Sequence, residues 1–400
     1  MDGARTRGQT AALAAVATMV RGSAPQAVLL VGPEGVGKTT LALDLAAGLL
    51  CTAALPDRPC RTCRACRLVE HGAHPDLHRR APAGPGRQVV MGGPDAKFRG
   101  VKDLVTDLAL MPVEGGARVA IVEAAHRMNE DAQSALLKTL EEPPAGVTIV
   151  LCADHEARLL PTVRSRCFRL RLGLVGLRDI EAVVADHGLA DPPTAARLGR
   201  LAGGRPGIAL AYARAPDAVL IRAELTRVLL DLTDAGPAAR LAAARSAIPR
   251  AIALSAALVA GDPTSAQARP GRRRGATTSP VVTSVGEGSD EEIQGDTDEP
   301  TAPPTRVPAT ERRRGVEVLL GLWTDIARDL VLIGAGGGRS VHDTVLLDEL
   351  GRIAAAVDPA ASVAFLVRSA RSADWLANNV SPELILDALV LGWPGRTAAA

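Results

Sequence analysis

The chain has 400 residues, of which 47% are hydrophobic and 2% aromatic, and its formal net charge is +2. That length exceeds one small hydrophobic core and predicts two or three domains. A charge so close to zero gives no electrostatic basis for tight DNA binding by this chain alone, and the scarcity of aromatic residues argues against a base-stacking platform for single strands.

Two further features of the sequence bear on the compartment. We find no apolar run long enough to predict a membrane span, and Met1–Arg5 lacks the apolar core of a signal peptide. Both features predict a cytoplasmic chain with no membrane partner. In a reducing compartment the six cysteines are poor candidates for disulfides.

A nucleotide-binding loop is the first motif along the chain. A helix is predicted over residues 9–20 and a buried strand over 27–31, and the strand runs directly into the Walker A pattern G-x-x-x-x-G-K-T, which a helix over 40–50 follows. The candidate phosphate-binding residues are Gly32, Pro33, Glu34, Gly35, Val36, Gly37, Lys38, Thr39 and Thr40.

The chemistry of such a loop is specific. Backbone N–H groups and the helix N-terminus surround the phosphates, Lys38 reaches the β- and γ-phosphates, and the Thr39 hydroxyl ligates Mg²⁺. The motif in this context favours phosphate binding over a chance glycine-rich turn, and ATP with Mg²⁺ is the candidate cofactor. A loop that is retained but no longer binds nucleotide is the alternative.

Four cysteines follow the helix after this loop, with the spacing C-x8-C-x2-C-x2-C. They are Cys51, Cys60, Cys63 and Cys66. Four thiolates in one short segment match the tetrahedral preference of Zn²⁺ and leave no open coordination position, so the pattern predicts a structural zinc module over residues 51–70. A redox pair or incidental thiols are the alternatives, and His71, His74 and His78 lie near enough to substitute for a ligand.

The next predicted elements complete a parallel α/β unit. After a loop at 80–100 and a helix at 101–110, an apolar strand ends at Glu123. An amphipathic helix then begins at the capping residue Asn129 and stops at a proline pair, and a second apolar strand covers 147–152. That succession is typical of the second half of a P-loop ATPase core.

Two sequence stretches in this half resemble a known family. Ala135-Leu-Leu-Lys-Thr-Leu-Glu-Glu-Pro-Pro144 and Ser165-Arg166-Cys167 resemble bacterial sliding-clamp loader subunits of the AAA+ class, and among them the delta-prime group of DNA polymerase III. The resemblance covers residues 8 to 260 well and the rest more weakly. It implies an α/β P-loop AAA+ core with a parallel sheet at 1–172, a small helical lid at 173–216, and an all-α collar at 217–260 and 315–400.

The same resemblance implies a trans-acting role for the S-R-C motif. In the family the arginine, here Arg166, projects into the ATP site of the neighbouring subunit, where a planar guanidinium matches a γ-phosphate. The alternative is that Arg166 pairs with a local carboxylate. The implied partners are the other subunits of a hetero-pentameric loader, bound through the collar, the sliding clamp, and primed DNA through the assembled complex.

Two positions depart from active motor subunits. Their Asp-Glu pair falls on Glu123, which can still hold Mg²⁺ through water, and on Ala124, which has no group to orient the attacking water. Losing such a base costs about 10²–10⁴ in rate. The lid arginine that touches nucleotide in active members falls on Gly207, with Arg205 offset by two residues, and Asp154 lies where the family has its polar sensor residue.

The last predicted feature is an interrupted helical region. Residues 261–314 lack aromatics and are rich in Pro, Ser, Thr and Gly, which predicts a disordered insertion. Helical periodicity returns over 316–393, with Trp323, Trp375 and Trp393 as predicted anchors of the collar.

These observations favour a clamp-loader subunit of the DNA polymerase III holoenzyme, a nucleotidyltransferase, that supplies Arg166 in trans and hydrolyses little ATP itself. One alternative is an ATP-hydrolysing motor subunit of the gamma/tau type. Another is an AAA+ regulator outside the polymerase.

Overall fold

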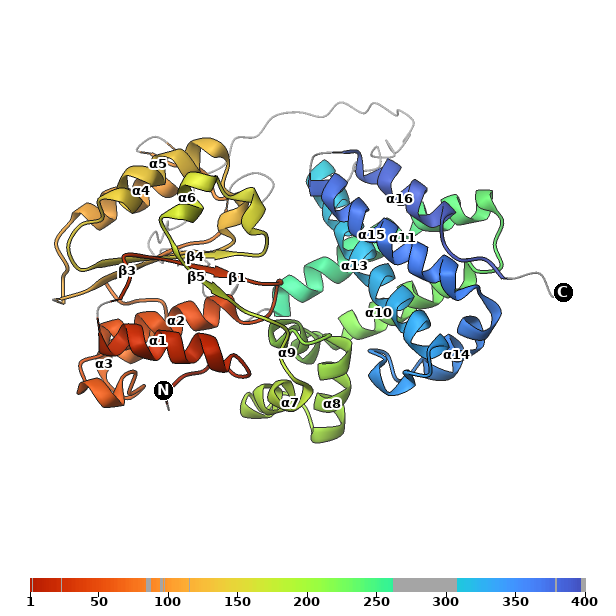
Figure 1. The fold of residues 1–400 in the computed structure, drawn as a ribbon, viewed down its shortest axis with the longest axis horizontal. Coiled ribbons are helices and arrows are strands. Elements are labelled where there is room, and N and C mark those ends of the chain that lie inside the picture. The colour runs from red at the N-terminus through yellow and green to blue at the C-terminus, as the bar shows by residue number, and fades with distance from the viewer. Residues whose placement is uncertain are drawn as a thin grey trace, which may run out of the picture.

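The three-dimensional structure is a computed structural model that describes residues 1, 3–22, 24–83, 88–93, 96, 98–114, 116–261, 308–377 and 380–396. An α/β unit, a small helical unit and a larger helical unit follow one another along the chain (Figure 1). This order confirms the predicted fold class. Most of the predicted insertion at 261–314 lies outside the described residues.

The α/β unit is built on a five-stranded sheet with the order β2-β3-β4-β1-β5. Every neighbouring pair is parallel. The strands are β1 (Ala27–Val31), β2 (Leu77–Arg80), β3 (Arg118–Val122), β4 (Val147–Ala153) and β5 (Phe168–Arg171). All residues of β1, β3 and β4 are buried, as expected for a parallel sheet that is covered on both faces.

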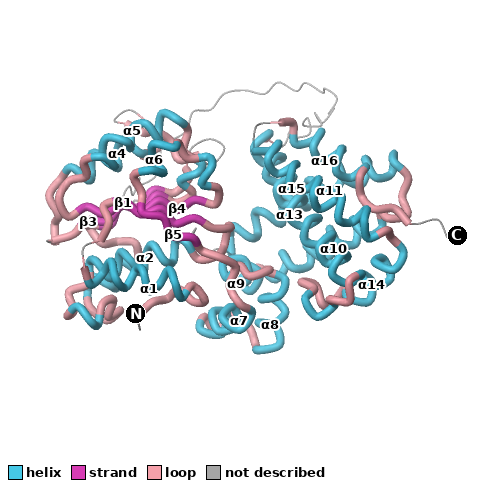
Figure 2. The backbone as a smooth tube through the Cα atoms, viewed as in Figure 1, coloured by secondary structure: helices cyan, strands magenta, loops and turns pink. Residues whose placement is uncertain are grey.

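Helices cover both faces of the sheet (Figure 2). One layer contains α1 (Thr10–Arg21), α2 (Lys38–Leu50) and α3 (Arg64–Glu70), and the other contains α4 (Val101–Ala109), α5 (Glu130–Glu141) and α6 (Pro161–Ser165). Alternate residues of β1 supply the two cores, because side chains of a strand point to opposite faces in turn: Val28 and Leu30 to one, Leu29 and Val31 to the other.

The lid and the collar are helical throughout. The lid consists of α7 (Leu177–Asp186), α8 (Pro192–Leu201) and α9 (Pro206–Arg214) around its own apolar cluster. The collar consists of α10 (Pro216–Asp231), α11 (Pro237–Gly261), α13 (Ala309–Gly334), α14 (Leu347–Ala356), α15 (Pro359–Ala377) and α16 (Pro382–Leu391). Short 3₁₀ turns are η1 (Leu55–Asp57), η3 (Ala125–Arg127), η4 (Glu156–Arg158) and η5 (Gly338–Ser340).

The collar core differs from the prediction in two places. Trp323 and Trp393 are buried, the latter edge-to-face with Phe365 at 4.8 Å between ring centroids, but Trp375 is half-exposed on α15 and does not anchor the core. Helix α13 begins at Ala309, before the predicted restart at 315. Its arginine-rich start is fastened to the bundle, since Arg313 donates to the Leu376 carbonyl and Arg312 pairs with Glu383.

Helix α11 differs from the expectation that no apolar run of the chain is long enough to span a membrane. Among the described residues it is the helix that is long and apolar enough, by length and composition, to cross a membrane, owing to its alanine-rich sequence. Core helices of helical bundles meet the same criterion, and α11 packs against α9, α10, α13 and α16.

Candidate functional site

The Walker A residues form the loop between β1 and α2, at the carboxyl edge of the sheet. Gly35 and Gly37 have φ values of +80° and +102°, in the left-handed region that glycine tolerates best. Helix α2 begins at Lys38, so its first N–H groups face the loop. Pro33 and Glu34 are exposed, Val36 is buried, and Thr39 and Thr40 are half-buried in the first turn of α2. This backbone has the form that a phosphate-binding loop requires.

The Lys38 ammonium is buried and has three partners. Its Nζ donates to the carbonyls of Gly32 and Pro33, each at 2.7 Å, and lies 2.6 Å from Asp154 Oδ1. These three acceptors match the three N–H groups of the ammonium. Asp154 directly follows β4. Phosphate binding at this loop therefore requires Lys38 to exchange at least one partner.

Glu123 has a partner that sequence reasoning missed. Its Oε1 accepts from Arg79 Nε at 2.9 Å and from Arg79 Nη2 at 2.5 Å, and the two side chains are 11% and 13% exposed. Ala124 follows in a left-handed conformation, with φ of +49°, and offers only a methyl group. A divalent metal needs oxygen ligands and a net negative site, so the residues at this strand end do not fit Mg²⁺.

His126 does not replace the base that is missing at Ala124. Its Nδ1 accepts from the Asp154 N–H at 3.1 Å, and its Nε2 lies 3.4 Å from Asp154 Oδ2. Burial lowers the pKa of His126 to about 4, so the ring is neutral at physiological pH. Both ring nitrogens thus face Asp154 and orient it toward Lys38.

The first turn of the lid helix α9 contacts the Walker A loop directly. The Gly207 N–H, at the start of α9, donates to the Gly35 carbonyl at 2.8 Å, and a Cβ at Gly207 would lie 3.2 Å from Gly35 Cα. Arg205 turns toward the collar, where its Nη2 lies 3.7 Å from Asp325 Oδ2. Neither residue brings a guanidinium to the loop.

The four predicted cysteines come together at the end of α2 and the start of α3. Their sulfur atoms lie within 4.8 Å of one another, with Cys51 Sγ 3.6 Å from Cys60 Sγ and 3.9 Å from Cys63 Sγ. Zn–S bonds of about 2.3 Å in a tetrahedron give S···S distances of about 3.8 Å, so the cluster fits zinc. The Thr62 hydroxyl and the Cys63 N–H lower the pKa of Cys60 to about 6, which favours a thiolate ligand.

Buried Asp44 of α2 connects this cluster to the N-terminal segment. Its carboxylate accepts from the Thr6 N–H at 2.9 Å and the Thr6 hydroxyl at 2.7 Å, and it pairs with Arg61. Arg61 lies between Cys60 and Cys63 and also donates to the Gly3 carbonyl at 2.6 Å. The cysteine module is therefore tied to the core through α2.

Arg166 lies at the opposite edge of the sheet from Lys38. It follows α6 and precedes β5, whose Phe168 is level with Val28 and whose Arg171 is level with Val31. The loop with Lys38 begins only after Val31, so roughly 13 Å of strand separates the two levels. Arg166 is exposed at this distance from the chain's own Walker A loop.

The immediate partners of Arg166 are local. Its Nη2 lies 2.6 Å from Glu141 Oε1 at the end of α5, and its Nη1 donates to the Thr162 carbonyl at 2.9 Å. The Ser165 hydroxyl donates to the same carbonyl at 3.0 Å. Burial raises the pKa of Cys167 to about 11, and its thiol donates to the Val163 carbonyl. The carboxylate pairing considered from sequence thus exists in the single chain, on a side chain that solvent reaches.

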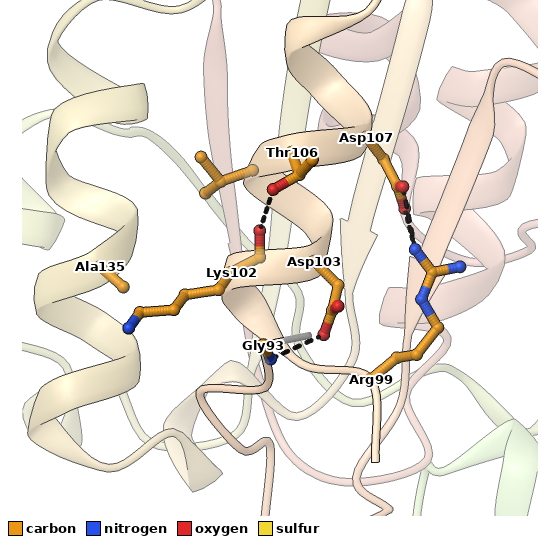
Figure 3. Close-up of a pocket in the computed structure, with 8 residues that line it drawn as sticks. Gly93, Arg99, Lys102, Asp103, Thr106, Asp107 and Ala135 are labelled. Carbon is orange, nitrogen blue, oxygen red and sulfur yellow. Dashed lines mark hydrogen bonds and ion pairs between the residues drawn. The ribbon is translucent and has the colours of Figure 1, made fainter. Parts of the chain in front are cut away.

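A hollow in the described structure lies away from these residues (Figure 3). It has a volume of about 470 Å³ and lies between α4 and α5. Arg99 pairs across it with Asp107 at 2.9 Å, and Lys102 extends toward Ala135. None of the predicted site residues lines it.

The N-terminal part of the chain is similar in sequence to known proteins. A family model described as "DNA polymerase III, delta subunit" matches residues 8–175. DNA polymerase III subunit delta' of Pseudomonas aeruginosa is 36% identical over 182 residues, which are 45% of this chain and 53% of that protein. DNA polymerase III subunit tau of Salmonella typhimurium is 32% identical over 196 residues, 48% of this chain and 29% of that protein. The chain spans about half the length of the first relative and less of the second.

A solved structure covers more of the chain at lower similarity. The DNA polymerase III, gamma subunit-related protein of Thermotoga maritima covers 94% of this chain and 97% of its own, at 15% identity and a TM-score of 0.36. The sequence matches confirm, over the N-terminal domain, the family resemblance predicted from the motifs.

Proposed function

We propose that this chain, whose residues 8–175 match the family model described as "DNA polymerase III, delta subunit", is a delta-prime-like subunit of the loader that places the sliding clamp on primed DNA. Its contribution is Arg166, which acts at the nucleotide of a neighbouring subunit. The observation that carries the proposal is the position of Arg166 at the amino edge of the sheet, away from the chain's own loop at the carboxyl edge.

The chemistry suits an arginine that acts between subunits. A guanidinium presents a planar fork to a γ-phosphate and stabilises the charge that develops there, and arginine fingers contribute about 10³–10⁵ in rate. In the single chain the Arg166 guanidinium is bound by the Glu141 carboxylate and the Thr162 carbonyl. A γ-phosphate carries more negative charge than Glu141 and lies in a drier site when two subunits meet, so it displaces the carboxylate.

Three features support weak hydrolysis by the chain itself. Ala124 supplies no base, Glu123 pairs with Arg79, and Gly207 stands where active members have a nucleotide-binding arginine. The missing base alone costs about 10²–10⁴ in rate. The loop residues 32–40 keep a phosphate-binding backbone, so nucleotide binding without efficient turnover is the expected property.

The cysteine cluster supports a structural zinc site held by Cys51, Cys60, Cys63 and Cys66. A bound zinc ion would cross-link the end of α2 to α3. With four protein ligands it has no open position and takes no part in catalysis.

Exposed apolar side chains support assembly with other loader subunits in a hetero-pentamer. Such side chains on α15 and α16 are Val363, Val367, Trp375, Leu384 and Leu391. Clusters of large apolar groups on a surface mark protein interfaces. We assign this face of the collar to the neighbouring subunits, and the same role in replication puts the chain in the cytoplasm.

A second apolar feature supports contact with the sliding clamp. Leu110, Met111 and Val113, between α4 and β3, are 65%, 85% and 70% exposed. The Arg118 guanidinium donates hydrogen bonds to the carbonyls of Leu110 and Met111 in this tip. An exposed apolar tip is suited to a hydrophobic pocket on a protein partner.

One alternative keeps support: an ATP-hydrolysing motor subunit of the gamma/tau type. The intact Walker A loop and the 32% identity to a tau subunit favour it. It differs from the first proposal in which residue of this chain the loader needs, because a motor subunit depends on Lys38 and a trans-acting subunit on Arg166.

The test is the ATPase and clamp-loading rate of the reconstituted loader in which only this subunit is changed. Arg166→Ala should slow clamp loading about 100-fold or more, while Lys38→Ala stays within about twofold. Arg169→Ala, an exposed arginine on β5 nearer to Arg166, is the matched control, and size-exclusion chromatography checks assembly. A loader that needs Lys38 and tolerates Arg166→Ala would establish the motor reading instead.

A further inference from the structure

The carboxyl edge of the sheet carries two ion pairs side by side. Lys38 pairs with Asp154, and Arg79 pairs with Glu123. The end of β4 lies between them: the buried Cys152 thiol has its pKa raised to about 12 by burial, and all four charged groups contribute to that environment. Two cations and two carboxylates therefore neutralise each other next to the nucleotide loop.

The Arg79–Glu123 pair is fixed by the sheet itself. Arg79 on β2 is level with Ile121 on β3 in the parallel register, and the Glu123 N–H continues the ladder by donating to the Arg80 carbonyl at 2.8 Å. Both side chains are largely buried, and two N–H groups of the guanidinium converge on one carboxylate oxygen. Because backbone pairing sets the distance, the contact is part of the fold.

This arrangement opposes a divalent cation in two ways. Mg²⁺ is held in nucleotide sites by one or two carboxylates together with phosphate oxygens and water. Glu123 already accepts from a guanidinium, whose positive charge also repels a metal ion placed at the same oxygen. The next position, Ala124, supplies no oxygen ligand from its side chain.

We propose that Arg79 takes the electrostatic place of the magnesium ion at this loop, so that Mg²⁺ does not strengthen nucleotide binding by this chain. Phosphates that enter are held by the loop N–H groups and Lys38 alone. The inference concerns the chain's own loop and does not depend on the trans role of Arg166. It gives a metal-insensitive site in which the guanidinium supplies the positive charge permanently.

The test is a titration of the purified full chain with a fluorescent ATP analogue, in excess MgCl₂ and in metal-depleted buffer. No chelator is added, so the cysteine cluster keeps any zinc. Mg²⁺ should change the affinity of the wild type by less than about fivefold. Arg79→Ala should make binding at least about tenfold tighter with Mg²⁺ than without, because the guanidinium no longer occupies Glu123 Oε1.

Three variants make the result decisive. Arg79→Ala combined with Glu123→Gln should lose the Mg²⁺ effect again, because the released carboxylate is gone. Arg80→Ala is the matched control, since the neighbouring arginine pairs with Asp107 on another side of β2 and should leave the Mg²⁺ response as in the wild type. Arg79→Gln replaces Arg79→Ala should the smaller side chain prevent folding, which thermal unfolding reports.

Two outcomes overturn the proposal. The first is a wild type whose nucleotide binding is strengthened fivefold or more by Mg²⁺. The second is a folded Arg79 variant that gains no Mg²⁺ dependence. Either result leaves the Arg166 test unaffected, because that test measures the neighbouring subunit's site.

Discussion

Asp76 provides a stability test of how the exposed tip is held. The carboxylate is buried at the start of β2 and accepts from the N–H groups of Val113 and Glu114, each at 2.8 Å. Its Oδ1 also lies 3.3 Å from Nη2 of buried Arg118. Asp76→Asn keeps the size of the side chain but removes its charge and turns one acceptor into a donor.

The expected loss follows from these contacts. In the variant, the new amide faces a backbone N–H, and Arg118 becomes a buried cation without a counter-charge. Breaking a buried ion pair from one side costs about 3–5 kcal/mol, a large part of the roughly 5–15 kcal/mol that a domain has in total. We therefore expect Asp76→Asn to lower the free energy of unfolding of the α/β unit by about 3 kcal/mol or more.

The contribution of Asp76 to stability should also depend on pH. Burial alone would raise the pKa of Asp76, but the N–H groups of Glu114 and Val113 and the Arg118 guanidinium together lower it. A lowered folded-state pKa means that the stabilisation is complete above the unfolded pKa of about 3.9 and is lost as the pH falls through the folded value. The difference between wild type and variant should be constant from about pH 6 to pH 8 and shrink only in acid.

Urea unfolding at several pH values measures both effects, and amide exchange of Val113 and Glu114 reports on the tip directly. Asp231→Asn is the control, because that carboxylate is exposed at the end of α10 and should change stability by about 0.5 kcal/mol or less. A loss below about 1 kcal/mol at neutral pH would refute the reasoning, since it would mean that Arg118 does not depend on Asp76.

Two other predictions concern the cysteine module and the collar. Purified chain should contain about one zinc ion, and Cys63→Ser or chelation should release it and expose α3 to proteolysis while the collar stays folded; a metal-free chain with an intact module would contradict this. Leu384→Glu should weaken binding to the other loader subunits about tenfold or more without lowering thermal stability, because that side chain is exposed on α16. Leu220→Glu is its control, because Leu220 on α10 is similarly exposed. If both variants weaken binding equally, the exposed side chains of α15 and α16 are not the interface with the other subunits.

The parts of the site that depend on local sequence could be predicted. The Walker A loop needs only a strand, a helix and glycines at fixed spacing, and each of these is readable within about fifteen residues. The cysteine cluster is likewise local, because C-x2-C spacing brings sulfur atoms together around one turn at the start of α3. The order of the three structural units was implied by the family resemblance, and chain length predicted only two or three domains.

Contacts set by strand register could not be predicted. Arg79 and Glu123 are 44 residues apart, and only the pairing of β2 with β3 makes them neighbours. The pairing of Arg166 with Glu141 depends in the same way on how α5 and α6 pack. Trp375 shows a further limit, because helical periodicity does not say which face of a C-terminal helix meets the core and which one remains exposed.

The two edges of the sheet divide the chemistry of this chain between them. At the carboxyl edge, the charged groups next to the nucleotide loop are already paired, and the lid rests on Gly35 through Gly207. At the amino edge, Arg166 is exposed together with the apolar tip. Because all strands are parallel, every connection that reaches the amino edge is free to vary without disturbing the loop at the other. The role proposed for Arg166 and the chain's own Walker A loop therefore share no side chain.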